Sequence, residues 1–130
     1  MKNALFLLAA ALCGVARAQD MKLAVQAYTF RDRSFVETVE TAKRLGLKYI
    51  EAYPGQRLGA GFEGTTDYKT ITADTLKRLK AFIDASGVRV VAYGVTGAND
   101  AAQWRQLTDF ATFLGIGVIR HRDHLTERAK

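Results

Sequence analysis

The sequence is poor in cysteine, with only Cys13 among its 130 residues. A small secreted scaffold held together by disulfides is therefore excluded, because such scaffolds need several cysteine pairs. Long apolar runs are also lacking, since none approaches the roughly 20 residues with which a helix crosses a bilayer. The formal charge of +6 is modest, and the lysines and arginines are spread along the chain, so no nucleic-acid partner is indicated.

The first 18 residues are organised like an export signal. A positively charged start precedes the uninterrupted apolar residues 4–12, and residues 16–18 read Ala-Arg-Ala, a small-x-small pattern that signal peptidase cleaves. Lipidation at Cys13 is the weaker alternative. We therefore expect a signal peptide at 1–18 and an exported, periplasmic chain from Gln19 onward, without membrane contact once the signal is removed.

One unit recurs three times in the chain: an amphipathic segment, a glycine and a short apolar strand. It reads Gly-Leu-Lys-Tyr-Ile-Glu-Ala-Tyr at 46–53, Gly-Val-Arg-Val-Val-Ala-Tyr at 87–93 and Gly-Ile-Gly-Val-Ile-Arg at 115–120. Glycine tolerates the left-handed conformation that ends a helix, so each unit marks a helix end followed by a strand. Together with an alternating segment at 22–30, the pattern predicts about four parallel strands and three helices.

The helix starts carry capping signals. Ser34 is followed by Glu37 three residues later, the spacing of a capping box. Apolar residues at helical spacing predict buried stripes that include Leu45 on the first helix and Trp104 on the third. The other two helices are expected to start at Thr72 or Asp74 and at Asn99 or Asp100.

Strands that alternate with helices over short connections form right-handed units and a parallel sheet, so the fold class is α/β. The sheet can be a small open one in the flavodoxin style, or a partial (β/α)8 TIM barrel, whose complete form takes about 250 residues. We assign residues 19–120 to the N-terminal half of a TIM-barrel-like domain. Residues 121–130 have almost nothing to bury and are expected to form a polar tail.

Residues 59–64 read Gly-Ala-Gly-Phe-Glu-Gly, the letters of a dinucleotide-binding fingerprint. That fingerprint requires the glycines to lead directly from a strand into a helix, with an acidic residue at a strand end about 20 positions later. Here polar residues follow, no helix starts before about Thr72, and Asp84 falls inside that helix. We therefore interpret the stretch as a flexible, lid-like loop.

Ligands meet the carboxyl ends of the strands in both architectures. A carboxylate at Glu51 must be paired, hydrogen-bonded or bound to a ligand, so a pocket role and a structural salt bridge are equally open. Tyr28 and Tyr93 are expected as pocket walls, because their hydroxyls need partners. The substrate-pocket candidates are Tyr28, Glu51, Tyr53, Tyr93 and, beside Arg120, His121.

His121, Asp123 and His124 resemble metal ligands by residue type. No apolar residues surround them to hold their geometry or exclude water, so a solvated tail is the favoured interpretation. The metal ligands are therefore unknown at this stage.

Three stretches together resemble a known family: Lys-Leu-Ala-Val-Gln-Ala-Tyr-Thr-Phe at 22–30, Gly-Leu-Lys-Tyr-Ile-Glu at 46–51 and Gly-Val-Arg-Val-Val-Ala-Tyr at 87–93. They are similar to the sugar phosphate isomerase/epimerase family of xylose-isomerase-like TIM barrels. The resemblance implies a barrel that binds Mn²⁺ or Mg²⁺ and shifts protons on a sugar or polyol through an enediol-type intermediate. Such chemistry needs a carboxylate base and a cation that holds the developing oxyanion.

The resemblance is incomplete, because that family carries most of its metal ligands on later strands and this chain ends at its fourth. Glu51 corresponds to the family's glutamate at the end of the second strand, which helps line the pocket, but no ligand set carries over. We therefore expect a truncated member that is inactive alone. Its open barrel edges could support self-association.

Other classes fit less well. Barrels resembling endonuclease IV use histidines from early strands, and none precedes His121. A phospho-receiver domain needs an aspartate at the end of the third strand, where this chain has Tyr93, Gly94 and Val95. The alternative that stays open is a non-catalytic periplasmic binding or scaffold module with a small open parallel sheet.

Overall fold

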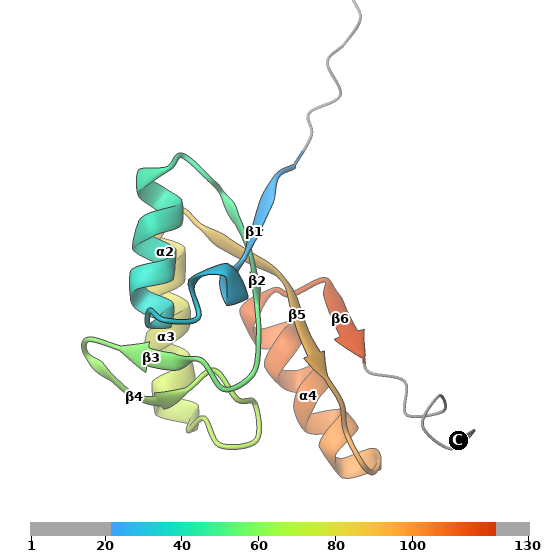
Figure 1. Cartoon of the computed structure of the whole chain (residues 1–130). Helices are drawn as coiled ribbons and strands as arrows, with labels where there is room; N and C mark the ends of the chain where they lie inside the picture. Colours follow the sequence, from blue (N-terminus) through green and yellow to red (C-terminus); the bar gives the residue numbers. More distant parts are fainter. Residues whose placement is uncertain (1–21, 122–130) are drawn as a thin grey trace, which may run out of the picture.

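The computed structural model describes residues 22–121, which form a four-stranded parallel sheet, three α-helices and a β-hairpin (Figure 1). The predicted signal peptide, Cys13, Asp123 and His124 lie outside these residues. None of the described helices is long and apolar enough to span a membrane. The elements are β1 (Ala24–Gln26), the 3-10 helix η2 (Ala27–Phe30), α2 (Phe35–Arg44), β2 (Tyr49–Ala52), β3 (Arg57–Gly59), β4 (Phe62–Thr65), α3 (Ala73–Ser86), β5 (Arg89–Thr96), α4 (Ala101–Leu114) and β6 (Val118–His121).

The strands of the sheet lie in chain order, β1-β2-β5-β6, and all pairs are parallel. A flavodoxin-like sheet would place its second strand outside the first. Right-handed crossovers that always step in one direction put all their helices on the same face. The described sheet therefore has the strand order of consecutive barrel strands, with a helix-covered face and an open face.

The predicted helix ends are confirmed. The Ser34 side chain accepts from the Glu37 backbone N–H at 3.3 Å, and the Glu37 carboxylate accepts from the Ser34 N–H at 2.7 Å, which completes the capping box. The Ser34 hydroxyl also donates to this carboxylate at 2.6 Å, and that bond, followed by the one from the Ser34 backbone N–H, lowers the pKa of Glu37. Gly87 takes a left-handed φ of 74° at the end of α3, as a helix-terminating glycine should.

The core lies between the helices and the face of the sheet that they cover. Ile50, Tyr93 and Leu107 are fully buried there. The prediction of burial is wrong for two residues, since Leu45 is 61% exposed and Trp104 is 37% exposed. Both lie at the edge of the apolar stripe, where helical spacing alone does not show how far the sheet extends.

The first strand is shorter than the predicted 22–30. Pairing with β2 ends at Gln26, and the chain then coils into η2, with the Arg31 N–H donating to the Tyr28 carbonyl at 3.2 Å. Ala27 is fully buried at this turn. The alternation of apolar residues continues through the turn, so it could not mark where the strand ends.

The predicted flexible loop at 59–64 is instead the antiparallel β3–β4 hairpin. Its Phe62 ring packs edge-on against Phe82 at 6.0 Å, while Arg78 stacks on Phe62 and donates to the Gly61 carbonyl at 2.7 Å. A Cβ on Gly59 would collide with the Ser34 side chain. The hairpin is therefore fixed against α2 and α3, and its glycines do not lead into a helix as a dinucleotide site requires.

A buried polar network ties the base of the hairpin to α2. The Gln56 amide nitrogen donates to Thr38 Oγ1 at 3.1 Å and to the Arg33 carbonyl at 3.2 Å. Thr66 Oγ1 donates to the Tyr53 carbonyl at 2.6 Å and accepts from the Gln56 N–H at 3.0 Å. These bonds fix the loop that follows Tyr53, and with it one wall of the site described next.

Candidate functional site at the carboxyl ends of the strands

Glu51 projects from the open face of the sheet, as predicted. Its neighbours Ile50 and Ala52 are buried beneath the helices, and successive side chains of a strand point to opposite faces. Gln26 is the register partner of Glu51 on β1 and is exposed on the same face.

An ion pair links Glu51 on β2 to Arg120 on β6, with Arg120 Nη1 2.9 Å from Glu51 Oε1. The two strands flank β5, so the side chains meet across it. Gly94 of β5 pairs with Arg120, and a Cβ there would collide with the Arg120 carbonyl oxygen. The Glu51 side chain is 18% exposed and that of Arg120 51%, so the pair stabilises the fold by about 1 kcal/mol at most. The structural salt bridge is thus present, and it stands at the solvent-facing surface where a ligand could reach it.

A hollow of about 390 Å³ opens at the carboxyl end of the sheet, and Gly94, which pairs with Arg120, is among its walls. Tyr28 and Tyr53 form a T-shaped pair in it, with ring centroids 5.1 Å apart and an interplanar angle of 77°. Burial raises the pKa of Tyr53, Tyr28 adds to the rise, and Arg31 opposes it. The lining residues are Gln26, Tyr28, Tyr53, Pro54, Gly94 and Val95.

Tyr93 faces the other way. Its side chain is fully buried, its ring lies 5.0 Å from Phe110 of α4, and its hydroxyl donates to the Thr66 carbonyl at 2.8 Å. Burial is the main cause of the raised pKa of this hydroxyl. The predicted pocket wall is therefore a core residue. The reason is a register shift between Ile50 and Glu51, opposite which β5 has one extra residue, so that Tyr93 pairs with Ala52 and turns toward the helices.

His121 is the last described residue of β6 and not the start of a tail. Its Nδ1 lies 3.2 Å from the Thr96 carbonyl oxygen, and its ring packs on Trp104 at 5.1 Å between centroids. A carbonyl oxygen only accepts, so Nδ1 carries the hydrogen and Nε2 is the nitrogen that can accept a proton. A side chain on Gly97 would press against the same ring. The carbonyl, the indole and Gly97 together fix the orientation of the imidazole.

The Trp104–His121 contact was missed by the sequence reasoning. Trp104 was assigned to the core because it lies on an apolar stripe, yet it stands in the first turn of α4, which follows the carboxyl end of β5. That position in the chain is the one signal that could have placed it near the end of β6, on the helix-covered side of the sheet.

The described residues do not fit a divalent cation. They contain no group of three or more histidine, cysteine, aspartate or glutamate residues that could hold a metal ion. Glu51 already pairs with Arg120, and a guanidinium beside a carboxylate disfavours a cation there. The arrangement can accept and donate hydrogen bonds and offer aromatic surface without a metal.

Solved structures similar to this fold include the following two. An uncharacterized protein from Parabacteroides distasonis ATCC 8503 superposes with a TM-score of 0.70 at 27% sequence identity over 77% of this chain and 42% of that one. The probable 3-DHS dehydratase AsbF involved in petrobactin synthesis from Bacillus anthracis superposes with a TM-score of 0.53 at 18% identity over 78% of this chain and 38% of that one. No protein-family description and no curated protein match the sequence.

The comparisons establish the fold at a coarse level. The parallel sheet with three helices is similar to that of the TIM-barrel neighbour AsbF. At this identity the likeness shows the fold alone. The chain spans less than half the length of either structure that it matches.

Proposed function

We propose that the described residues form the substrate-binding end of a sugar- or polyol-processing enzyme of the xylose-isomerase-like TIM-barrel type, with isomerisation or epimerisation as its reaction. One observation carries the proposal: a hollow with an aromatic pair opens at the carboxyl end of the open face, and an ion pair lies on the neighbouring register positions of the same face. This is the end at which TIM-barrel enzymes bind substrate.

The chemistry of the hollow suits a polyhydroxylated molecule. Sugar hydroxyls both donate and accept, so the Gln26 amide in the hollow can donate to them. Glu51 and Arg120 are the register partners of Gln26 and Gly94, and beside the hollow they offer a further acceptor and further donors. The apolar C–H face of a sugar can lie against Tyr28 and Tyr53. The volume of about 390 Å³ is at the lower end of the range for small-molecule sites.

Proton transfer on a sugar needs a base beside the reacting carbon and a group that stabilises the oxyanion. Glu51 is the carboxylate beside the hollow that could accept a proton, whereas His121 faces the helix-covered side of the sheet, where it packs on Trp104 of α4. Because the described residues do not fit Mn²⁺ or Mg²⁺, we derive no step through a metal, and we propose that the residues in and beside the hollow bind and orient the substrate. Turnover then requires groups beyond residues 22–121.

A non-catalytic binding module is the second candidate, favoured because the Glu51 carboxylate beside the hollow is already paired with Arg120. In either case β1 and β6 each have an unpaired edge within residues 22–121. Unpaired edges favour association with further strands, and we propose self-association of the chain there.

An NMR titration with xylitol tests the proposed function. We expect saturable shifts at Tyr53, Gly94 and Val95, because these residues line the hollow. Glu51→Gln should weaken the titration several-fold, whereas Glu40→Gln on the exposed surface of α2 should not. No saturable change with any sugar or polyol would refute substrate binding. Metal-dependent epimerisation by the purified chain would overturn the proposal that the described residues only bind.

A further inference from the structure

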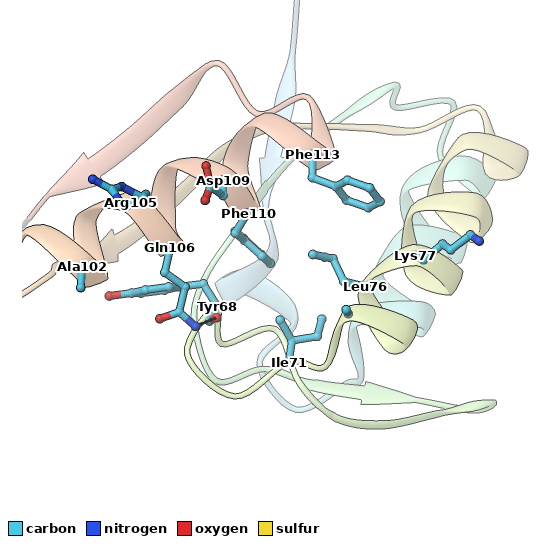
Figure 2. Close-up of a pocket in the computed structure, with 11 residues that line it drawn as sticks. Tyr68, Ile71, Leu76, Lys77, Ala102, Arg105, Gln106, Asp109, Phe110 and Phe113 are labelled. Carbon is cyan, nitrogen blue, oxygen red and sulfur yellow. Dashed lines mark hydrogen bonds between the residues drawn. The ribbon is translucent and has the colours of Figure 1, made fainter.

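A second, larger hollow lies on the helix side of the sheet. This cleft of about 680 Å³ separates α3 from α4, and Figure 2 shows Ile71, Leu76, Phe110 and Phe113 converging on it from both sides. It shares no lining residue with the hollow at the carboxyl end of the sheet. A site here would therefore be independent of the proposed function.

The walls of the cleft are apolar because their polar groups already have partners. The Tyr68 hydroxyl donates to the Gly97 carbonyl at 2.8 Å, and the Gln106 amide nitrogen donates to the Tyr68 carbonyl at 3.1 Å. Ala73 and Ala102 add small side chains that leave the space between the helices open. An occupant consequently finds hydrocarbon and aromatic surface inside.

The size and surroundings favour a small molecule over a protein. Among the large apolar side chains that are exposed in the described part, only Phe113, at 45%, lines the cleft. A stable protein interface buries roughly 800 Å² of each partner, which a single exposed ring does not provide. Small-molecule sites occupy about 300–1,000 Å³, a range that includes this cleft.

The charges at the rim indicate which end group the molecule carries. Lys77, Arg105 and Asp109 stand at the edges of the cleft, and none of them forms an ion pair within residues 22–121. Two cations against one carboxylate favour an anion. Their charged ends point away from the apolar centre in Figure 2, as groups at the mouth of a hydrophobic site should.

We propose that the cleft between α3 and α4 binds a small amphipathic monocarboxylate, with its hydrocarbon or aromatic body among Ile71, Leu76, Phe110 and Phe113 and its carboxylate near Lys77 or Arg105. For a ten-carbon chain the expected Kd is on the order of 1 mM or tighter.

Methyl NMR of the full 130-residue chain tests this with decanoate as the probe. We expect saturable shifts at the methyl groups of Ile71 and Leu76, with those of Val95 and Val118 on the opposite side of the sheet unmoved. Decyltrimethylammonium, which has the same chain and a positive head, should bind at least fivefold more weakly. Ala102→Phe should fill the cleft and abolish binding, whereas Ala101→Phe adds the same ring beside it, outside the lining, and should leave binding intact.

Several results would overturn the proposal. These are no saturable shift at Ile71 and Leu76, larger shifts at Val95 and Val118, or equal binding of the cationic probe. A dimer that Ala102→Phe abolishes and Ala101→Phe preserves would show that a second copy fills the cleft. Should Ala102→Phe fail to fold, the map of shifts on the unsubstituted chain decides the matter. Failure of the xylitol titration would leave this result unaffected.

Discussion

The two faces of the sheet differ in what their side chains contact. On the helix-covered face, Ile50 and Tyr93 are fully buried and Tyr93 has its hydroxyl bonded within the core. On the open face, Glu51 and Arg120 form an ion pair that solvent reaches, and Tyr28 is 52% exposed. The same strands thus supply stability on one side and chemically available groups on the other. Substitutions should separate the two roles.

The largest expected difference is in the free energy of unfolding. Ile50→Ala removes fully buried methyl groups and should cost about 2–5 kcal/mol, since the surrounding core relaxes only partly. Tyr28→Ala on the open face should cost about 1 kcal/mol at most. Urea denaturation measures both, and equal losses would show that the open face is itself part of the folding core.

A smaller difference should separate two tyrosines. Tyr93→Phe leaves the buried Thr66 carbonyl without its donor and should cost about 1–3 kcal/mol. The Tyr53 hydroxyl forms no hydrogen bond within residues 22–121. Tyr53→Phe should therefore change the free energy of unfolding by about 0.5 kcal/mol at most and weaken xylitol binding instead. If Tyr53→Phe destabilises the chain as much as Tyr93→Phe does, Tyr53 is structural.

The capping box should give the helix side a pH dependence. The pKa of Glu37 is lowered from 4.5 in the folded chain, so its contribution is complete above about pH 4.5 and is lost as the pH falls through the lowered value. Ser34→Ala removes the main cause and should cost about 1 kcal/mol at neutral pH. Urea midpoints between pH 2 and pH 7 should show this difference shrinking as the pH falls below the ordinary value of 4.5 and through the lowered pKa. A difference that stays constant would mean that the charge of Glu37 plays no part.

The smallest expected effect is the coupling between Glu51 and Arg120. A double-mutant cycle with Glu51→Gln and Arg120→Gln should give about 0.2–1 kcal/mol, reduced further by salt, because Arg120 is half exposed. The same two variants should impair ligand binding much more than stability. A coupling above about 3 kcal/mol would make the pair a structural element.

The helix ends could be predicted from the sequence because they depend on neighbouring residues. Part of the site could not, because it depends on contacts between residues that are distant in the chain. Ser34 and Gly87 act on neighbouring backbone groups, so the sequence itself contains the reason for each helix end. The direction of Tyr93 depends on the extra residue that β5 has opposite β2, and a bulge leaves no mark in an alternating pattern.

The remaining differences also arise from contacts between distant residues. The β3–β4 hairpin is stabilised by the contacts of Phe62 with Phe82 and Arg78 on α3. The glycine-rich sequence of the hairpin does not predict these contacts. Trp104 and His121 are brought together by α4 and β6, and their spacing in the chain gives no sign of it. The face on which Glu51 lies was predicted correctly, because strand alternation is a local rule. Its ion pair with Arg120 could not be predicted, because it depends on the order of the strands in the sheet.

A chemical-shift map of the full chain titrated with xylitol tests the division between the two faces most directly. We expect the shifts to concentrate around the hollow at the carboxyl ends of the strands, at Tyr53, Gly94 and Val95, and to leave Ile71 and Phe113 between α3 and α4 unmoved. Shifts confined to Ile71 and Phe113, or none at saturating xylitol, would contradict a substrate-binding role for the open face.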